Sequence, residues 1–482
     1  MRIRHASVAA IVPNALTLLS LTVCGCGDDV QQPSQPPGWD DGIRVAASYD
    51  LNPDPNIVEV NLHAALANLS FAPGQTTTAW TYNGQVPGPL IRARVGNRVI
   101  VHFTNDLPEP TTIHWHGLRI PAAMDGMPSP SQPATPPGGG FDYDFVVPDA
   151  ATFWYHPHVD SAAQVGYGLY GPLIVDDPDE PAGLGDEVVM VVSDIAIGDD
   201  GTLAPGNAGG DLASYFGREG TVLLVNGQVR PTLKARPGLR QRWRIINAAK
   251  SRYFRIAMPG HSFQRIGGDG GRLSAPIDVD TPVIAPGERE DLVVVPQGAP
   301  GSQIVVQWAP YDRGFGTNLE PSVDLFVVQL EGSPVATEPL PPLNRTLVPL
   351  SVAGATPVSI QLTVDGSSPL ALGINGVTYG DAQPFMATVG ETQLWTVTNN
   401  LDCAHPFHMH GFFFQVQSRT GPPDPFDPLD PFEWKDTVNV PINGSVTFAV
   451  NFDDRPGMWM FHCHILDHAE AGMMGSLMLM EP

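Results

Sequence analysis

The stretch from His462 to Met473, HCHILDHAEAGM, holds the side chains with the most distinctive chemistry in the chain. On a strand, His462 and His464 would face one way and Cys463 the other, because successive side chains point to opposite faces. One short segment can therefore serve two metal sites. A thiolate, imidazoles and a thioether suit a soft, redox-active metal, and two His, one Cys and a weak axial Met describe a blue-copper electron-transfer site.

Three more His-x-His pairs occur along the chain, at residues 114 and 116, 156 and 158, and 408 and 410. Within each pair, both imidazoles would lie on the same strand face and can converge on one metal. Together with His462 and His464 they supply eight histidines, which predicts a metal cluster.

The segments that must position these residues belong to an internal repeat. A Gly, an alternating strand and an Asn nine positions after the Gly recur at 96–105, 238–247 and 390–399, and an Asn-Gly pair precedes each copy, at 83–84, 226–227 and 375–376. Such turns between alternating runs indicate antiparallel β structure. The copies lie 142 and 152 residues apart (238 − 96 and 390 − 238), which predicts three β-sandwich domains of roughly 140 residues, an ordinary domain size. A further alternating run predicts a buried strand face made of Val446, Phe448, Val450 and Phe452.

Aligned on this repeat, the first and third domains carry matching histidines, because Asn105 lies nine residues before His114 and Asn399 nine before His408. Two such domains facing each other would place the cluster in their interface. Domain 3 also carries side chains that domain 1 does not match: His405, Cys463, His468 and Met473. His405 is an odd number of residues from His408, so it would face the side that Cys463 uses. The middle domain has neither set and is predicted to be a metal-free spacer.

Together, the segments HWHG at 114, HPH at 156, HPFHMHG at 405 and HCHILDHAEAGM at 462 resemble the signature segments of three-domain multicopper oxidases of the laccase type, similar to bacterial spore-coat laccases and cuprous oxidases. The resemblance covers the repeat frame from about residue 45 to the end. It implies an all-β chain of three tandem cupredoxin-like Greek-key β-sandwich domains. We expect domain 1 over residues 43–180 with half of a trinuclear site, a copper-free domain 2 over 181–340, and domain 3 over 341–482 with type 1 copper and the other half.

The same resemblance implies four coppers per chain and a role for each motif residue. Type 2 copper would be held by His114 and His408. The type 3 pair would be held by His116, His156, His158, His410, His462 and His464. Type 1 copper would be bound by His405, Cys463, His468 and, as a weak axial ligand, Met473. A copper-free structural protein of the same fold would lack these ligands. The remaining histidines of the mature chain are interpreted as structural or surface residues: His63, His102 and His261.

The activity that the resemblance implies is a laccase-like oxidation. Single electrons would leave a small phenol or aromatic amine at type 1 copper, pass through Cys463 to its neighbours His462 and His464, and reduce dioxygen to water at the trinuclear cluster. The alternative is a periplasmic cuprous or metal-ion oxidase that serves copper tolerance. Oxygen reduction also consumes protons, and positioned carboxylates are suitable carriers. Asp467 and Asp125 are the candidates, against the simpler interpretation that both are turn or surface acids.

The sequence leaves the electron donor open. The Pro/Gly/Ser stretch 128–140 and the Pro/Asp-rich stretch 421–432 are candidate loops near the donor, but nothing in them names a ligand. Core packing is expected to explain most of the 13 methionines, including the group at 458, 460, 474, 478 and 480. The formal net charge of −25 argues against a nucleic-acid partner, and we expect a monomer.

The first 26 residues are typical of an export signal of the lipoprotein type, with a basic start and an apolar run before Cys24 and Cys26. A lipid on Cys26, or on Cys24 as second choice, would anchor an exported, periplasmic or surface protein to a membrane. The plain alternative is ordinary cleavage that discards both. Residues 27–42 are predicted to be a disordered tether. Cys403 is left without a partner and is predicted to be a buried free thiol.

Overall fold

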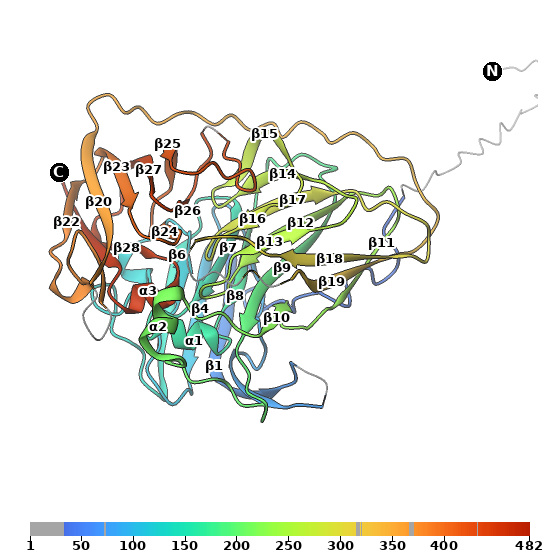
Figure 1. Cartoon of the computed structure of the whole chain (residues 1–482), viewed down its shortest axis with the longest axis horizontal. Coiled ribbons are helices and arrows are strands. Elements are labelled where there is room, and N and C mark those ends of the chain that lie inside the picture. Colours follow the sequence, from blue (N-terminus) through green and yellow to red (C-terminus); the bar gives the residue numbers. More distant parts are fainter. Residues whose placement is uncertain (1–32, 72–73, 315–318, 320, 366–370, 431) are drawn as a thin grey trace, which may run out of the picture. The chain divides into compact units, whose positions relative to one another are not determined.

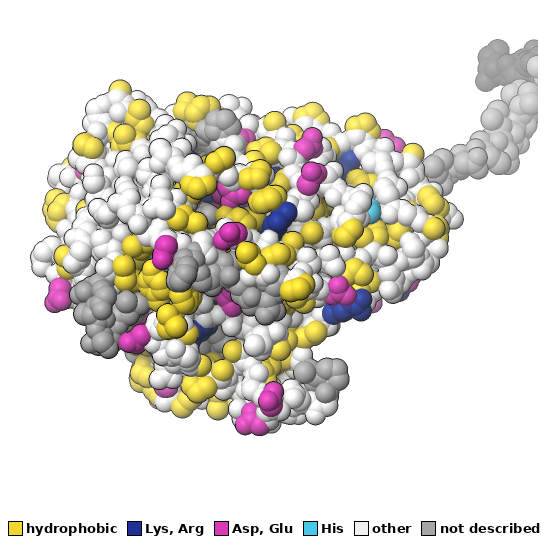
Figure 2. All heavy atoms as spheres, in the orientation of Figure 1, with side chains coloured by type: hydrophobic (Ala, Val, Ile, Leu, Met, Phe, Trp, Pro, Cys, Tyr) yellow, Lys and Arg dark blue, Asp and Glu magenta, His cyan; other side chains and the backbone are white. Residues whose placement is uncertain are grey.

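The computed structural model describes residues 33–482 apart from 72–73, 315–318, 320, 366–370 and 431 (Figure 1). The predicted signal at residues 1–26, with Cys24 and Cys26, lies outside the described residues. None of the helices in the described part has the length and apolar character needed to cross a membrane. Figure 2 shows acidic side chains scattered over the visible face, in keeping with the net charge of −25.

Domain 1 consists of two β-sheets, with strand orders β2-β1-β4-β6 and β3-β8-β7-β5. Its strands are β1 (Ile57–Leu69), β2 (Thr77–Tyr82), β3 (Ile91–Arg94), β4 (Arg98–Asn105), β5 (His114–His116), β6 (Gly139–Val146), β7 (Ala151–His156) and β8 (Gly171–Asp176). Side chains from both sheets, such as Val101, Phe103 and Phe153, share one buried core, which is the packing of a sandwich.

Domain 2 also consists of two β-sheets, with strand orders β10-β9-β12-β17-β14-β15 and β11-β19-β18-β13-β16. Its strands are β9 (Asp186–Ile195), β10 (Val222–Val225), β11 (Thr232–Ala235), β12 (Gln241–Asn247), β13 (Phe254–Ala257), β14 (Phe263–Gly268), β15 (Gly271–Val279), β16 (Val283–Ile284), β17 (Arg289–Val294), β18 (Gln303–Ala309) and β19 (Val323–Leu330). Trp243, Phe254 and Trp308 lie in its core.

Domain 3 has strand orders β21-β20-β23-β27-β25 and β22-β29-β28-β24-β26. Its strands are β20 (Thr356–Asp365), β21 (Ala371–Ile374), β22 (Phe385–Thr388), β23 (Thr392–Asn399), β24 (His405–Met409), β25 (Phe414–Thr420), β26 (Thr437–Val440), β27 (Gly444–Asn451), β28 (Gly457–Cys463) and β29 (Met474–Met480). The buried face predicted for β27 is confirmed, since Val446, Phe448 and Val450 are fully buried and Phe452 continues that face.

The predicted repeat is visible in the structure at the level of single hydrogen bonds. The first strand of each domain pairs parallel with the repeat strand, as β1–β4, β9–β12 and β20–β23. Each repeat ends in a fully buried Asn, Asn105, Asn247 or Asn399. In every copy the Asn side-chain oxygen accepts the backbone N–H two residues later, at 3.0 Å. The prediction of an all-β chain of three sandwich domains is confirmed.

The helices of the described residues are short: η1 (Ala122–Met124), α1 (Ser161–Gly166), α2 (Gly210–Phe216), η2 (Tyr379–Asp381) and α3 (Leu466–Glu470). α3 contacts both α1 of domain 1 and α2 of domain 2. It therefore lies where elements of all three domains meet, beside the C-terminal motif.

The N-terminal segment differs from the prediction of a disordered tether over residues 27–42. Its described part packs against domain 2, where Trp39 contacts the core and the Gln35 side chain accepts a hydrogen bond from Arg236 N at 3.0 Å. Ile43, expected to open domain 1, is fully buried in the domain 2 core. The first strand of domain 1 begins at Ile57.

The C-terminal methionines also differ from expectation. On β28 and β29, alternate residues such as Trp459, Leu477 and Leu479 fill the core of domain 3. Met458 and Met478 are on the opposite face and are partly exposed, and Met480 is 43% exposed. Met460 lies on the same face as Met458 but is buried, and its sulfur accepts the Tyr379 hydroxyl at 3.4 Å. Packing in the domain 3 core therefore does not explain this outward row.

Candidate metal centres

Ladder pairing between strands brings the His-x-His pairs of each terminal domain together. β5 pairs antiparallel with β7 and sets His114 opposite His156. β24 pairs with β28 in the same way and sets His408 opposite His462. Directly opposed side chains on one face of a sheet have Cβ atoms about 4.5–5.5 Å apart, so each domain presents two adjacent pairs of imidazoles.

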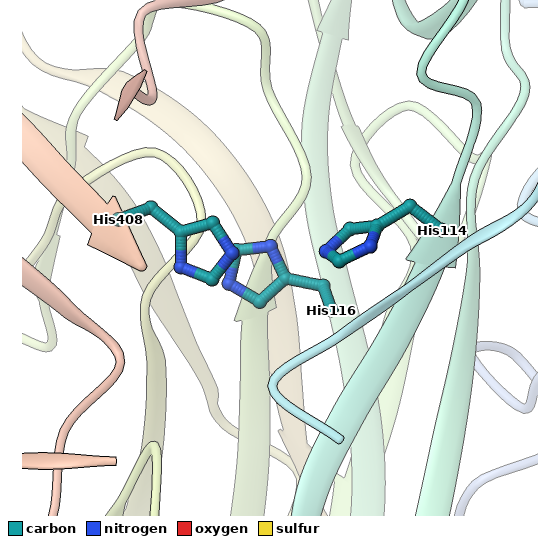
Figure 3. A group of neighbouring side chains, drawn as sticks. All are labelled: His114, His116 and His408. Atoms are coloured by element: carbon teal, nitrogen blue, oxygen red, sulfur yellow. The ribbon is translucent and has the colours of Figure 1, made fainter. Parts of the chain in front are cut away.

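The eight histidines of these pairs meet at the boundary between domains 1 and 3. Their ligand nitrogens form three groups whose members lie within 4.8 Å of one another: His114–His116–His408, His116–His156–His464 and His158–His410–His462. Each group draws on both domains. Figure 3 shows the first group, in which the rings of His116 and His408 stack with centroids 3.8 Å apart.

The unpartnered nitrogens of this cluster fit bound copper. Among the described residues, buried ring nitrogens without a hydrogen-bond partner belong to His114, His116, His156, His408 and His464. Nε2 of His462 lies only 3.2 Å from Nε2 of His410 and 3.3 Å from Nε2 of His158. Buried polar groups normally have partners, so nitrogens that converge without one are suited to a shared metal.

Burial also sets the protonation state of the cluster. Removal from water lowers the pKa of His116, His156, His158, His462 and His464 well below 6.5. It lowers the pKa of His410 to about 3. Neutral imidazole is the form that offers a lone pair to a metal, so at neutral pH these rings are ready to bind.

The second centre lies inside domain 3, on the opposite face of the same strands. Sγ of Cys463 is 3.4 Å from Nδ1 of His405 and 3.6 Å from Nδ1 of His468. Met473 is fully buried beside them, and its carbonyl accepts the Cys463 N–H at 3.1 Å. Burial raises the pKa of the Cys463 thiol, so a bound cation is needed to hold the thiolate. A thiolate, two imidazoles and a nearby thioether are the donor set of a blue-copper site.

The outer nitrogens of the two imidazoles beside Cys463 have unlike partners. Nε2 of His468 lies 2.9 Å from the carbonyl oxygen of Tyr215, on α2 of domain 2. Nε2 of His405 lies 3.5 Å from Sγ of Cys403. The prediction that Cys403 is a buried free thiol is confirmed, but its contact with His405 was not predicted from the sequence.

Two aspartates join the cluster histidines across the domain boundary in a reciprocal way. Asp125 of domain 1 accepts His114 Nδ1–H on its carbonyl oxygen, and its carboxylate lies 2.9 Å from Nδ1 of His410 in domain 3. Asp436 of domain 3 accepts His408 Nδ1–H on its carbonyl oxygen, and its carboxylate lies 3.2 Å from Nε2 of His116 in domain 1. Such hydrogen bonds orient the rings that bind a metal.

Asp436 was not identified from the sequence. It lies 28 residues after His408 (436 − 408), whereas Asp125 lies 11 after His114 (125 − 114). The longer connection in domain 3 hides the correspondence, because Asp436 directly precedes β26 whereas Asp125 follows η1 and lies 14 residues before β6 (139 − 125). Burial opposes ionisation of Asp436, but the Arg289 guanidinium and the two histidines hold its pKa well below the usual value.

The described residues of domain 2 contribute no side chain to either group of ligands, but the domain is more than a spacer. Arg289 is fully buried and donates to the Asp436 carboxylate, at 2.7 Å from Nη1 to Oδ1. Gly287 has φ +89° and lies against the rings of His464 and His116, where a Cβ would come within 3.1 Å of both. Only glycine adopts that conformation without steric cost. Because a Cβ at Gly287 would also contact both rings, this loop of domain 2 packs directly against the cluster.

Asp467, one of the two proton-relay candidates, is buried, and its carboxylate hydrogen-bonds with groups outside the cluster imidazoles. Its carboxylate accepts the backbone N–H of Arg218 at 2.7 Å and the Ser251 hydroxyl at 3.3 Å, and it pairs with the Arg218 guanidinium. Glu470, an acid of the same motif, was not predicted from the sequence. Its carboxylate accepts the Ser161 hydroxyl at 2.8 Å, and burial raises its pKa.

The three histidines interpreted as structural or surface residues lie outside both centres. His63 pairs with Asp106 at 2.7 Å and His102 with Asp142 at 2.8 Å, both at exposed positions. His261 accepts the backbone N–H of Gln297 at 2.9 Å.

Comparison with known proteins agrees with this architecture. Family models described as multicopper oxidase match residues 64–180, 188–316 and 351–481. The chain is 32% identical to Multicopper oxidase MmcO of Mycobacterium tuberculosis over 83% of each chain. It is 28% identical to a laccase of Bacillus subtilis over 84% of this chain and 91% of that one. The solved structure of a multicopper oxidase from Campylobacter jejuni, titled a metallo-oxidase, superposes with a TM-score of 0.79 at 27% identity, over 91% of this chain and 94% of that one. The chain therefore belongs to the multicopper oxidase family, copper-binding oxidoreductases that couple oxidation of a reducing substrate to reduction of dioxygen.

Proposed function

We propose that the chain is a laccase-like oxidase that takes single electrons from phenols or aromatic amines at a type 1 copper and reduces dioxygen to water at a trinuclear copper cluster. The position of Cys463 carries this proposal. Its side chain lies with His405 and His468, while its neighbours His462 and His464 lie in the cluster. Three consecutive residues therefore join the two centres. Bound copper would supply the one-electron redox chemistry. The chain supplies the buried side chains that would hold the copper ions.

The grouping of the ring nitrogens supports one assignment of ligands. We assign type 2 copper to His114 and His408, which form one group with His116. The other two groups we assign to the type 3 pair: His116, His156 and His464 for one ion, and His158, His410 and His462 for the other. We assign type 1 copper to His405, Cys463 and His468, with Met473 as axial ligand.

We propose Asp125 and Asp467 as proton carriers. Asp125 touches His114 and His410 directly. Among the described residues, Asp467 forms no hydrogen bond with a cluster imidazole, but it lies three residues after the cluster residue His464. On its other side it pairs with Arg218, and Lys250 Nζ is 3.8 Å away. Both basic residues line a cavity of about 420 Å³ between domains 1 and 2, which supports a path for protons from that cavity.

Oxidation of Cu(I) is the second candidate function, and the outward methionine row favours it. Met478 on β29 is the cross-strand partner of both Met386 on β22 and Met458 on β28. Met386 is 51% exposed. Thioethers are soft ligands that select Cu(I), and neighbouring strands hold these three within reach of one ion.

Oxygen uptake under identical conditions separates the two functions. The copper-loaded chain is supplied with a methoxyphenol or with Cu(I), and the initial rates are compared. We expect faster uptake with the phenol. Faster uptake with Cu(I), together with its loss in Met478→Leu, would establish the second function instead.

We further propose that the chain is exported and lipidated at Cys26, from the composition of its first 26 residues. Mass spectrometry of the mature N-terminus tests this proposal. A diacylglyceryl group on Cys26 is the expected result, and an unmodified terminus beyond Cys26 would show ordinary cleavage.

A further inference from the structure

A cavity of about 420 Å³ at the boundary between domains 2 and 3 lies next to the type 1 site. It is lined by Ala404, which precedes the ligand His405, and by part of the Pro/Asp-rich stretch 421–432. This stretch is fixed to domain 2, because the Val283 N–H donates to the Phe426 carbonyl at 2.9 Å. The cavity therefore has walls from two docked domains and a position beside a ligand strand.

Aromatic side chains connect the cavity with the strand that carries His405. Tyr311 lines the cavity, and its ring stacks on buried Tyr253 with centroids 5.4 Å apart at 23°. The Tyr253 hydroxyl donates to the Asn439 side chain at 2.9 Å. Asn439 on β26 lies directly across the ladder from Pro406, the residue after His405. An electron donor in the cavity thus has a short route of packed rings and hydrogen bonds to the type 1 site.

The cavity lining also includes Arg255, which has no carboxylate within ion-pair distance among the described residues. Arg255 lies 3.8 Å above the ring of Phe426. Its hydrogen bonds go to uncharged oxygens, from Nε to the Thr281 hydroxyl at 3.1 Å and from Nη1 to the Pro310 carbonyl at 3.2 Å. Within the described residues, it forms no ion pair.

Asp424, the acid of the lining that acts electrostatically on Arg255, already accepts other hydrogen bonds. One of its oxygens accepts the Tyr311 hydroxyl at 2.5 Å and the other accepts the Phe426 N–H at 2.9 Å. Burial lowers the pKa of Arg255, and Asp424 opposes that shift only in part. A guanidinium remains charged in proteins, so Arg255 offers a positive charge beside the Phe426 ring that lacks an ion pair among the described residues.

We propose that this cavity binds an aromatic donor that carries a carboxylate, such as a phenolic acid, with the carboxylate on Arg255 and the ring beside Tyr311. The inference rests on the proposed laccase-like function and names its donor. For each turnover of the donor, the phenolic O–H bond breaks, one electron passes to the type 1 site, the proton goes to water and the phenoxyl radical leaves. Four such steps supply the four electrons that one dioxygen needs.

The negative charge of the chain makes a preference for a phenolic acid over its neutral ester a sensitive test of the proposal. A net charge of −25 repels anions, so a phenolic acid would bind less well than its neutral ester unless a local cation reverses the preference. Because Arg313 and Arg419 also line the cavity, the acid and its methyl ester are compared in both the unchanged chain and Arg255→Gln, which isolates the contribution of Arg255.

Binding is tested first, with ligands that cannot be oxidised. Calorimetry with the copper-loaded full chain compares 4-methoxybenzoate with its methyl ester. We expect the acid to bind about tenfold more tightly, the effect of one charge-assisted hydrogen bond. Arg255→Gln should abolish the difference and Arg255→Lys should keep part of it. Arg236→Gln is the matched control, because Arg236 also donates to backbone carbonyls, at Ser333 and Ser34, and lies outside the cavity lining.

Oxidation is tested next, as the ratio of kcat/KM for 4-hydroxy-3,5-dimethoxybenzoate to that for its methyl ester. Arg255→Gln should lower this ratio about tenfold, and 4-methoxybenzoate should inhibit competitively with an inhibition constant equal to its Kd. Equal binding of acid and ester to the unchanged chain, an acid preference that survives in Arg255→Gln, or non-competitive inhibition would overturn the inference. Failure to oxidise either compound, with acid binding intact, would instead overturn the proposed function.

Discussion

The carboxylate of Asp436 in domain 3 lies 3.2 Å from Nε2 of His116 in domain 1. The same carboxylate binds the buried Arg289 of domain 2, so one side chain joins all three domains at the edge of the copper cluster. Its counterpart Asp125 makes the reverse contact, from domain 1 to His410 of domain 3. Copper binding and the docking of the domains should therefore depend on each other.

Asp436→Asn tests this dependence. The change leaves the fully buried Arg289 without its closest carboxylate and weakens the orientation of His116. We expect fewer than four coppers per chain, an altered type 2 signal in electron paramagnetic resonance, and an unchanged type 1 absorption band. The free energy of unfolding should fall by about 3–5 kcal/mol, as for other broken buried pairs.

Asp291→Asn is the matched control for that experiment. It breaks another buried pair, with Arg242 at 2.8 Å, entirely inside domain 2. We expect a similar loss of stability with normal copper signals. If Asp291→Asn perturbs the type 2 signal as strongly as Asp436→Asn, the effect of Asp436 is general destabilisation and not orientation of the cluster.

Asp467→Ala tests the proposed proton path. We expect the type 1 absorption to persist, because the hydrogen bond from His468 to Tyr215 does not involve this carboxylate. Turnover should fall about 100-fold, within the range for a lost proton-transfer group. Arg218→Gln breaks the same ion pair but keeps the carboxylate, and it should retain far more activity. Turnover of Asp467→Ala that matches the unchanged chain across pH would rule the relay out.

The contact between Cys403 and His405 should tune the type 1 potential. A stronger acceptor on the outer nitrogen makes imidazole a better donor and stabilises the oxidised metal. Cys403→Ser should therefore lower the midpoint potential and Cys403→Ala should raise it, each by tens of millivolts, on a scale where about 59 mV is tenfold for one electron. Redox titration of the type 1 band measures both, and shifts of the same sign would contradict the role assigned to the contact.

The copper-free chain should lose stability in acid. Burial lowers the pKa of His468 to about 4, against about 6.5 in an unfolded chain. Between these values the unfolded state binds more protons, so the stability is complete above pH 6.5 and is lost as the pH falls toward 4. His468 alone should account for about 3 kcal/mol. Urea unfolding at several pH values measures the slope, which should decrease in His468→Gln and would remain unchanged if the ring were already protonated in the fold.

The parts of the fold that the sequence predicts are those governed by local periodicity. The Asn-terminated repeat at Asn105, Asn247 and Asn399 indicates three sandwiches, because the turn and strand signals lie within a few residues of each other. The alternation around Cys463 likewise predicts two centres on opposite faces of one strand. Both depend only on neighbours in the chain.

The missed features depend on how the domains dock. Asp436, Gly287 and Tyr215 reach the metal centres from connections whose length and path no local pattern specifies. The same holds for Arg255, an ordinary strand residue until the loop that carries Phe426 covers it. The described part of the predicted tether differs from the prediction for a related reason, because Trp39 packs against the domain 2 core.

An anaerobic reductive titration tests the central claim most directly. The copper-loaded chain is titrated with a one-electron donor, and one equivalent of dioxygen is then added while the type 1 band and peroxide are followed. The account predicts that four electrons per chain complete the reduction, that a single dioxygen restores the oxidised spectrum, and that water forms without peroxide. Uptake of a single electron, or release of hydrogen peroxide, would contradict electron transfer from the type 1 site through Cys463 to a trinuclear cluster.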